Sequence, residues 1–588
     1  MKKQLTAIML CSLMLASILL GCDSSRGNSP SSDPASTPEQ TEESVAPVSD
    51  TSDSETPDEE LVTLQVFSMP SNMSGLQDNS YWAEILQKDL NVQIELLPAG
   101  DEAETKLSAL MASNNLPDLV VFKDNVTFVT DAIEAGLIIN LDEHMDALPN
   151  VAANAKNALQ LMRDKNSLDT GAAYAVPTGV TNQVNEAGEA GGPYLRWDLY
   201  TQLGSPELKE IEDYLPVLAD MLELEPTNSA DQPNYGMTIF DDWDSNVSWP
   251  VRMITEMYGV TQDGLGFIER NHDTGSMTSI YDDNSYFKRA IKFFYSANQM
   301  GLMDPDLITD GWDDYVEKVN AGRSMFQLLS WTSWAYETED TRNSMRSYKG
   351  TWFDSAKVIL DVPTYTGGAN GNSWYAISSS SKNTDKALAF LDYMYNADNL
   401  WTLAWGEQGI AWDVNENGPF RTETGWKMKN DNLPFANGGT IGEGLNVINA
   451  YGIPWTAVNP TYGKRMDEVD WEKMEDAPAA YAVDEDWSEK MNARDGVDYL
   501  LKHDMYVTPQ YVPALPAFPD NLQAIVDQLS GENKVATYKM IVAADDAEFD
   551  ALWSALVETA QGLGADEVND WVIENYDINL AEGEKYMQ

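Results

Sequence analysis

The sequence predicts an α/β protein with more than one lobe, and three observations carry this prediction. The chain has 588 residues of which 43% are hydrophobic, so it is too long for one ordinary core and too apolar for a disordered chain. Short apolar runs typical of strands alternate with segments of helical spacing, which favours a parallel sheet covered on both faces. No linker-like stretch divides the chain after residue 60, so we expect short crossings between the lobes.

The expected elements begin with a β-α-β unit. Its strands are marked by Val62, Leu64 and Val66 and by Val92, Ile94 and Leu96, and its helix by Trp82, Ile85 and Leu86. Next come a helix around 107–111, an apolar strand in the segment LPDLVVF (116–122) and a helix around 126–133. Two later helices are expected around 387–395 and 549–560, the second ending at Gly562 and Gly564 as glycine C-caps do.

Charge and rare residues exclude several classes of function. The chain has 36 Lys and Arg against 95 Asp and Glu, and its formal charge of -59 would repel the phosphates of nucleic acids. Its two cysteines are Cys11 and Cys22, and its three histidines are far apart, so no group has the spacing of zinc ligands or of a Cys/His dyad. We therefore expect no nucleic-acid partner, no disulfide, no cofactor and no metal.

The first 60 residues indicate export and anchoring. Lys2 and Lys3 precede an apolar run over residues 5–20, and the run ends in Leu-Leu-Gly-Cys, which resembles the bacterial lipobox. We expect residues 1–21 to be a lipoprotein signal peptide and Cys22 to carry fatty-acyl chains such as palmitate on the extracellular face of the cell membrane. A retained transmembrane anchor needs about 20 apolar residues, and this run is shorter.

The stretch 22–60 is expected to be an acidic, disordered tether. Ser, Thr, Pro, Asp and Glu dominate it, and this composition cannot offset the entropy of ordering. The rule for flexible chains gives it a root-mean-square reach of roughly 35 Å. The folded part would therefore turn freely beside the membrane.

Several segments, in order, resemble one known family. They are KLSALMASNNLPDLVVF (106–122), EAGLIINL (134–141), YAVPTG (174–179), YLRWDLYTQLG (194–204), GLMDPD (301–306), AGRSMFQLLSW (321–331), the block from 372 to 412 that begins NSWYAIS, and AEFDALWSALVETAQGLGADEVNDW (547–571). Together they are similar to the extracellular solute-binding proteins of ABC importers, family 1, and most closely to their LplA-like (LipO-like) lipoprotein branch.

The resemblance implies a hinged, two-lobed fold of the periplasmic-binding-protein type (type II), with the ligand cleft between the lobes. It implies a first lobe of residues 61–175 plus 374–420 and a second of 176–373 plus 421–588. It also implies a carbohydrate ligand, from oligosaccharides to uronate-containing ones, and the transmembrane subunits of an ABC permease as partners. The chain would be a monomer without catalytic residues, bound to the membrane through its lipid anchor only. A crevice at the ends of parallel strands is where such sheets bind ligands.

Aromatic residues supply most of the candidate ligand contacts. All 18 tryptophans lie after residue 60, and sugar rings stack their C–H faces on aromatic planes. Trp331 and Trp334 directly follow an apolar strand, Trp374 and Tyr375 begin the return to the first lobe, and Trp249 lies in a loop-then-helix segment that borders the cleft in similar proteins. The alternative for each ring is ordinary packing in the core or on the surface.

Two charged residues are further candidates. Arg196 could pair with an anionic sugar or with an internal carboxylate, and the internal ion pair is the favoured role. Asp124 follows the apolar strand at 119–122, where it could accept hydrogen bonds from sugar hydroxyls or serve as the N-cap of the next helix.

Some relatives carry an EF-hand-like calcium loop, which needs alternate oxygen ligands, a glycine at the sixth position and an acid at the twelfth. The corresponding stretch LEPTNSADQPNYGMT (224–238) lacks this pattern. Asp413, Asn415, Asn417 and Gly418 fit its first half, but Thr424 stands where the closing acid should be. A hairpin turn explains the Asn-Gly pair equally well.

Two rival functions remain beside transport. A secreted glycosidase or lyase needs two carboxylates flanking the bond, but such a pair can be found by chance among 95 acids, and no G-x-S-x-G nucleophile motif is present. A sensory or adhesion lipoprotein that keeps the binding fold is not separable from a transport protein by sequence.

Overall fold

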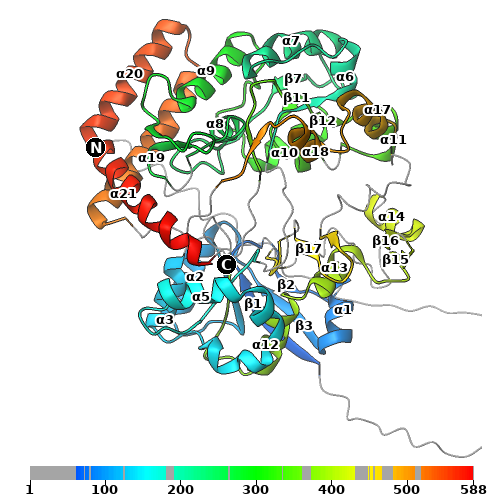
Figure 1. The fold of residues 1–588 in the computed structure, drawn as a ribbon, viewed down its shortest axis with the longest axis vertical. Coiled ribbons are helices and arrows are strands. Elements are labelled where there is room, and N and C mark those ends of the chain that lie inside the picture. Colours follow the sequence, from blue (N-terminus) through cyan, green and yellow to red (C-terminus); the bar gives the residue numbers. More distant parts are fainter. Residues whose placement is uncertain are drawn as a thin grey trace, which may run out of the picture. The chain divides into compact units, whose positions relative to one another are not determined.

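The computed structural model describes residues 61–586 apart from 72, 79–80, 124–125, 181–190, 263–264, 334–335, 361–372, 417, 431–447, 449, 455–456, 467–480 and 510–517. Buried side chains in the described part form two separate hydrophobic cores. The first core takes residues between 64 and 180 and between 374 and 466, and the second takes residues between 194 and 360 and between 481 and 576. The fold is therefore two-lobed, and the chain visits each lobe twice (Figure 1).

The cores differ from the expected lobe boundaries in two places. Val176 and Val180 belong to the first core, so the first visit extends beyond residue 175. The second visit does not end near residue 420, because Ile448, Ile453 and Met466 also pack into the first core. Their burial removes apolar surface from water, which holds this segment in the first lobe.

A six-stranded sheet of order β2-β3-β1-β4-β14-β5 forms the centre of the first lobe. Its strands are β1 (Val62–Ser68), β2 (Gly75–Leu76), β3 (Val92–Leu97), β4 (Leu119–Phe122), β5 (Val176–Pro177) and β14 (Trp374–Ile377). β1 pairs in parallel with β3 and β4, as the sequence predicts. The prediction of a parallel sheet is wrong for the rest, because β14 comes back from the second lobe and pairs antiparallel with β4 and β5.

Four helices of this lobe lie where periodicity predicts them: α1 (Tyr81–Leu90), α2 (Ala103–Ala112), α3 (Val126–Glu134) and α12 (Thr384–Tyr393). Four more were not predicted: α4 (Pro149–Asn154), α5 (Lys156–Lys165), α13 (Ala397–Trp405) and α14 (Glu423–Asn430). In α1 the stripe Trp82, Ile85 and Leu86 is buried against the core. Two short ribbons complete the lobe, β15 (Trp412–Asn415) with β16 (Gly418–Arg421) and β17 (Val458–Asn459) with β18 (Lys464–Arg465).

The second lobe is built on a four-stranded sheet of order β12-β6-β11-β7. Its strands are β6 (Tyr194–Arg196), β7 (Tyr235–Met237), β11 (Ser324–Gln327) and β12 (Tyr348–Gly350). β7 and β11 are parallel, whereas β6 is antiparallel to both of its neighbours. Smaller pairings join β8 (Val260–Thr261), β9 (Ile268–Asn271) and β10 (Met277–Ser279), and β13 (Val358–Ile359) with β19 (Tyr506–Val507).

The helices of the second lobe come from both visits of the chain. The first visit gives α6 (Trp197–Gln202), α7 (Tyr214–Leu224), α8 (Trp249–Glu256), α9 (Tyr286–Gln299), α10 (Trp312–Asn320), α11 (Glu339–Asn343) and the 3-10 turns η3 (Ile211–Asp213) and η4 (Ser330–Ser333). The second gives α17 (Ala482–Met491), α18 (Gly496–Lys502), α19 (Asp520–Ile541), α20 (Asp546–Leu563), α21 (Ala565–Gly583) and η5 (Glu584–Tyr586). The expected glycine C-cap of α20 is confirmed at Gly564, whose φ of 98° favours glycine.

Candidate functional site

The carboxyl ends of the parallel strands β7 and β11 define one edge of the second sheet. The loop 238–248 leaves β7 at this edge and leads into α8, and η4 follows the carboxyl end of β11. α10 ends at Asn320, shortly before β11 begins, so it runs back beside that strand and its N-terminal part lies toward η4. We call this side of the sheet the carboxyl edge. Ligands of α/β sheets bind outside the carboxyl ends of strands, so a ligand site is expected there.

A cluster of aromatic rings lies at the carboxyl edge. Trp243, on the loop after β7, stacks on Trp312 with ring centroids 4.7 Å apart and planes 24° apart. The ring of Phe240 meets Trp243 edge-on at 4.9 Å. Trp243 nevertheless keeps 38% of its surface exposed. Part of the apolar surface of Trp243 is therefore open to solvent beside a stacked partner, and we call Trp243 with Trp312 the indole platform.

Trp249 supports the platform from inside the lobe. It is 1% exposed, its ring contacts Phe240 at 4.4 Å, and its indole N–H donates to the Phe240 carbonyl at 2.5 Å. Its centroid lies 5.8 Å from that of Trp243. The ligand contact predicted for Trp249 is therefore corrected to packing, because the side chain has no face left for a solute.

Hydrogen bonds join α10, which carries Trp312, to η4, which contains the predicted ligand-binding residue Trp331. The hydroxyl of Tyr315, on α10, lies 3.5 Å from Oγ1 of Thr332 in η4. Thr332 Oγ1 in turn donates to Oε1 of Gln327, the last residue of β11, at 2.8 Å. The backbone of Trp331 lies in η4, but its side chain is outside the described residues, as is all of Trp334. The binding roles of both stay predictions.

Three carboxylates of the loop 238–248 are already engaged within the protein. Asp242 accepts the backbone N–H of Trp312 at 2.6 Å, and Asp244 accepts that of Trp249 at 2.9 Å. Asp241 forms an ion pair with Lys534 at 2.9 Å. Burial raises the pKa of Asp244 to about 6, and the bond from the Trp249 N–H and the charge of Lys534 oppose this rise.

Arg196 lies away from the carboxyl edge. Its fully buried guanidinium donates to Asp198 at 2.8 and 2.9 Å and to the carbonyl of Gly322, just before β11 begins, at 3.2 Å. Glu225 is a second carboxylate partner at 3.2 Å. The structure thus shows the internal ion pair, and the alternative pairing with an anionic sugar is not supported.

The first-lobe candidates in β14 are core residues. Trp374 lies between Phe122 and Pro177 in the sheet and is 3% exposed. Tyr375 is fully buried, and its hydroxyl donates to the carbonyl of Ala450 at 2.9 Å. Their predicted ligand contacts are corrected to packing, because β14 inserts between two strands and the core covers both rings. Asp124 and Cys22 lie outside the described residues.

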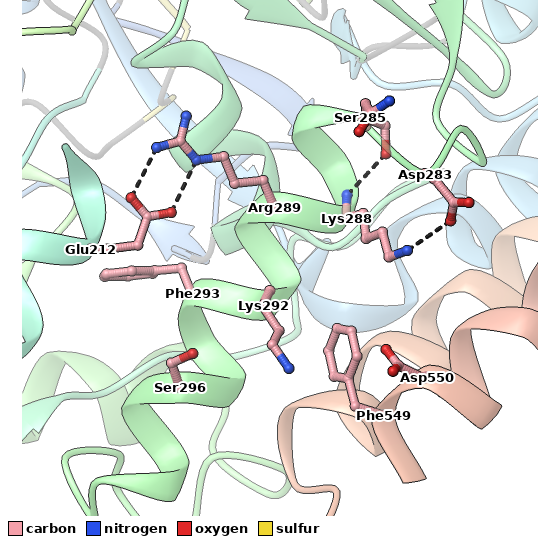
Figure 2. A pocket seen from close by; sticks show the side chains of 11 residues that line it. Glu212, Asp283, Ser285, Lys288, Arg289, Lys292, Phe293, Ser296, Phe549 and Asp550 are labelled. Atoms are coloured by element: carbon pink, nitrogen blue, oxygen red, sulfur yellow. Dashed lines mark hydrogen bonds and ion pairs between the residues drawn. The ribbon is translucent and has the colours of Figure 1, made fainter. Parts of the chain in front are cut away.

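A cavity of about 420 Å³ opens elsewhere on the second lobe, along one face of α9 (Figure 2). Figure 2 shows the α9 cations pointing to acidic partners: Arg289 pairs with Glu212 at 2.9 Å and Lys288 with Asp283 at 2.7 Å. Lys292 pairs with Asp546 at 2.6 Å. Because Lys288, Arg289 and Lys292 are all paired with acids of the protein, no unpaired cation lines the cavity, and it contains none of the residues that the sequence predicts.

The proposed first half of a calcium loop is a β-hairpin. Asn415 of β15 pairs with Gly418 of β16, and Asp413 accepts the backbone N–H of Val414 at 2.9 Å. Among the described residues no group of three or more His, Cys, Asp or Glu side chains is placed to hold a metal ion. Within the same residues, no helix combines the length and the apolar character that a membrane crossing requires.

Comparison with known proteins identifies the family. The profile of the family described as "Bacterial extracellular solute-binding protein" matches residues 81–411, more than half of the chain. The chain belongs to this family. Members of this solute-binding family are binding proteins, so the chain is not an enzyme.

Individual relatives of this solute-binding protein are distant. Lipoprotein LipO of Bacillus subtilis (strain 168) is 22% identical over 378 residues, which cover 60% of this chain and 68% of LipO. Among solved structures, the alginate-binding protein AlgQ2 without calcium ion is 16% identical with a TM-score of 0.58, covering 88% of this chain and 98% of that one. An extracellular solute-binding protein from Bifidobacterium longum subsp. infantis is 16% identical with a TM-score of 0.55, covering 89% and 99%. These structures share the fold.

Sequence reasoning missed the indole platform. Trp243 stands in the acidic segment DDWDS after a short strand, and Trp312 stands in GWDD at the start of a helix. A tryptophan flanked by acids is a signal for partial exposure, because its neighbours in sequence hold it near water. The contact between these two segments, however, arises only from the tertiary fold.

Proposed function

We propose that this solute-binding protein is the receptor of an ABC importer, that it captures a carbohydrate, an oligosaccharide, between its lobes, and that it delivers the solute to the permease subunits. The observation that carries the proposal is the indole platform at the carboxyl edge. Trp243, which is stacked on Trp312 and 38% exposed, offers a sugar ring an apolar surface. Nearby carboxylates and backbone groups suit sugar hydroxyls.

The names of the related solved structures support the carbohydrate class. One is an alginate-binding protein, a second is described as an HMO-binding, ABC-transporter-associated protein from Bifidobacterium longum infantis, and a third from S. pneumoniae was solved in complex with kestose. Each shares the two-lobed fold with this chain. Capture would proceed by a hinge movement in which the solute shifts the population toward a closed state.

The anchoring part of the proposal rests on the N-terminal sequence. The lipobox-like Leu-Leu-Gly-Cys before an acidic segment supports lipidation at Cys22, and the name of the relative LipO calls it a lipoprotein. A receptor held near the membrane by a tether would meet its permease at a high effective concentration.

A thermal-shift screen of the full chain against neutral and charged mono- and oligosaccharides tests the proposal. A ligand at one hundred times its dissociation constant adds about 2.7 kcal/mol of stability, which is readily seen as a higher melting temperature. We expect a stabilising sugar, and we expect chromatography to recover it chemically unchanged. If no sugar raised the melting temperature and a peptide or another metabolite did, the carbohydrate assignment would be overturned.

A further inference from the structure

The helix N-termini at the carboxyl edge are each engaged by an acid of the protein itself. A helix N-terminus carries unsatisfied N–H groups and a positive partial charge, which makes it a natural site for carboxylates. Here α8 and α10 both begin at this edge, and both are already bound by the protein's own acids. Asp244 accepts from the first residue of α8 and Asp242 from the first residue of α10.

The basic residues of the neighbourhood are also committed. Lys534 forms an ion pair with Asp241, and Arg196 forms ion pairs with two carboxylates near the opposite end of β11. Two further acids, Asp313 and Asp314, directly follow Trp312 in sequence and are exposed. Among the described residues beside the platform, acids therefore outnumber bases, and like charges across a binding site are strongly disfavoured.

We propose that the solute is a neutral, hydroxyl-rich oligosaccharide and that the site discriminates against uronate-containing sugars. This inference rests on the proposed carbohydrate function. Asp242 and Asp244 serve as acceptors that satisfy the helix N-termini and at the same time repel a sugar carboxylate. The indole platform supplies the attraction, which needs no charge on the solute.

Titration calorimetry of the full chain with neutral and uronate trisaccharides of matched linkage tests this inference. We expect the best neutral sugar to bind at least tenfold more tightly than any uronate sugar, with little dependence on salt. Equal or tighter uronate binding would overturn the inference but leave the carbohydrate function intact. A carbohydrate panel without any binder would overturn the proposed function itself and the inference with it.

Charge-neutral variants provide the second readout. The double substitution Asp242→Asn and Asp244→Asn keeps both capping acceptors, because asparagine caps helices as well as aspartate does. We expect it to improve uronate binding severalfold more than neutral-sugar binding. The matched control is Asp231→Asn, an exposed acid in the turn before β7, at the opposite end of that strand from the platform loop. An identical effect of the control and the double variant on uronate binding would contradict a local role.

An independent observation concerns the end of the chain. α21 packs into the second core through Val568, Val572 and Tyr576. Its continuation η5 reaches α5, whose own apolar face belongs to the first core. In Figure 1 the red helix α21 leads to the C-terminus. The chain therefore connects the lobes a fourth time after its three crossings.

The contacts at this fourth connection are specific. Tyr586 is 4% exposed, its hydroxyl donates to Asp164 at 3.0 Å, and its carbonyl accepts from the side chain of Asn157 at 2.8 Å. Lys165 and Glu582 form an ion pair beside it. We infer that α21 and η5 act as a strut that restrains the movement of the lobes, so that less conformational freedom is lost when a solute closes them.

The strut is tested by Tyr586→Ala in the full chain, with Ile578→Ala, a 52% exposed residue of the same helix, as the control. Single-molecule energy transfer between dyes on the exposed positions Lys382 and Asp231 reports the lobe separation. We expect a broader distribution and a separate, earlier melting transition of one lobe in Tyr586→Ala only. Distributions and melting profiles that match the control would overturn the strut.

Discussion

Replacing Trp243 by leucine should weaken solute binding tenfold to a hundredfold. The exposed 38% of this residue corresponds to about 95 Å² of a side chain of roughly 250 Å². Covering that area with a sugar ring at about 25 cal/mol per Å² contributes about 2.4 kcal/mol. This agrees with the roughly 1 to 3 kcal/mol that aromatic platforms give a stacked base, and about 1.4 kcal/mol is tenfold in affinity.

Leucine is chosen because it keeps part of the packing against Trp312 and Phe240 while it removes the flat face. The assay is titration calorimetry with the sugar that stabilises the wild type most, at a temperature where circular dichroism shows both proteins folded. Trp401→Leu is the matched control: fully buried in the first core and outside the platform, it should lower the free energy of unfolding by a few kcal/mol and leave the affinity of the folded protein unchanged. Trp243→Leu binding within twofold of the wild type would refute the platform.

The remaining predictions concern stability and anchoring. Burial raises the folded-state pKa of Asp244 from 3.8 to about 6, so ionised Asp244 lowers the stability of the fold progressively as pH rises from about 4 to 6, by at most about 3 kcal/mol. Melting curves of Asp244→Asn should therefore show a gain in stability at pH 7 that vanishes near pH 4. A gain that does not change with pH would contradict this. Arg196→Met should lower the free energy of unfolding by about 3 kcal/mol in urea, because Asp198 loses its partner, without changing the affinity for the solute; lost affinity at unchanged stability would restore a binding role. Cys22→Ser should move the protein from the membrane fraction to the medium in a fractionation experiment, whereas retention would show that residues 5–20 act as an anchor.

Periodicity predicts the elements of this fold but not all of its topology. The stripes of α1 and α20 and the alternation in β1 and β3 are local patterns, so the sequence reveals them directly. β14 shows the limit. Its four buried residues read as an ordinary apolar strand, and nothing local indicates that it enters the sheet antiparallel after a visit to the other lobe.

The candidate site shows the same limit more strongly. Tryptophans that begin or follow a strand look alike in sequence, yet Trp374 is enclosed by neighbouring strands while Trp243 stays partly exposed on a stacked partner. Arg196 forms the internal ion pair that the sequence favours, because a buried guanidinium needs carboxylates. The platform depends on two segments about 70 residues apart in sequence, and only the packing of α10 against the loop after β7 brings them together.

The alternation of the chain between two cores has a consequence for biosynthesis. The first core needs residues up to Met466, and the second needs residues up to Tyr576. A ribosome must therefore deliver most of the polypeptide before either core can close, unlike in a protein whose domains follow one another and fold in turn. The partly synthesised chain exposes half-built sheets during that time, and its high negative charge would keep such intermediates apart until the last helix arrives.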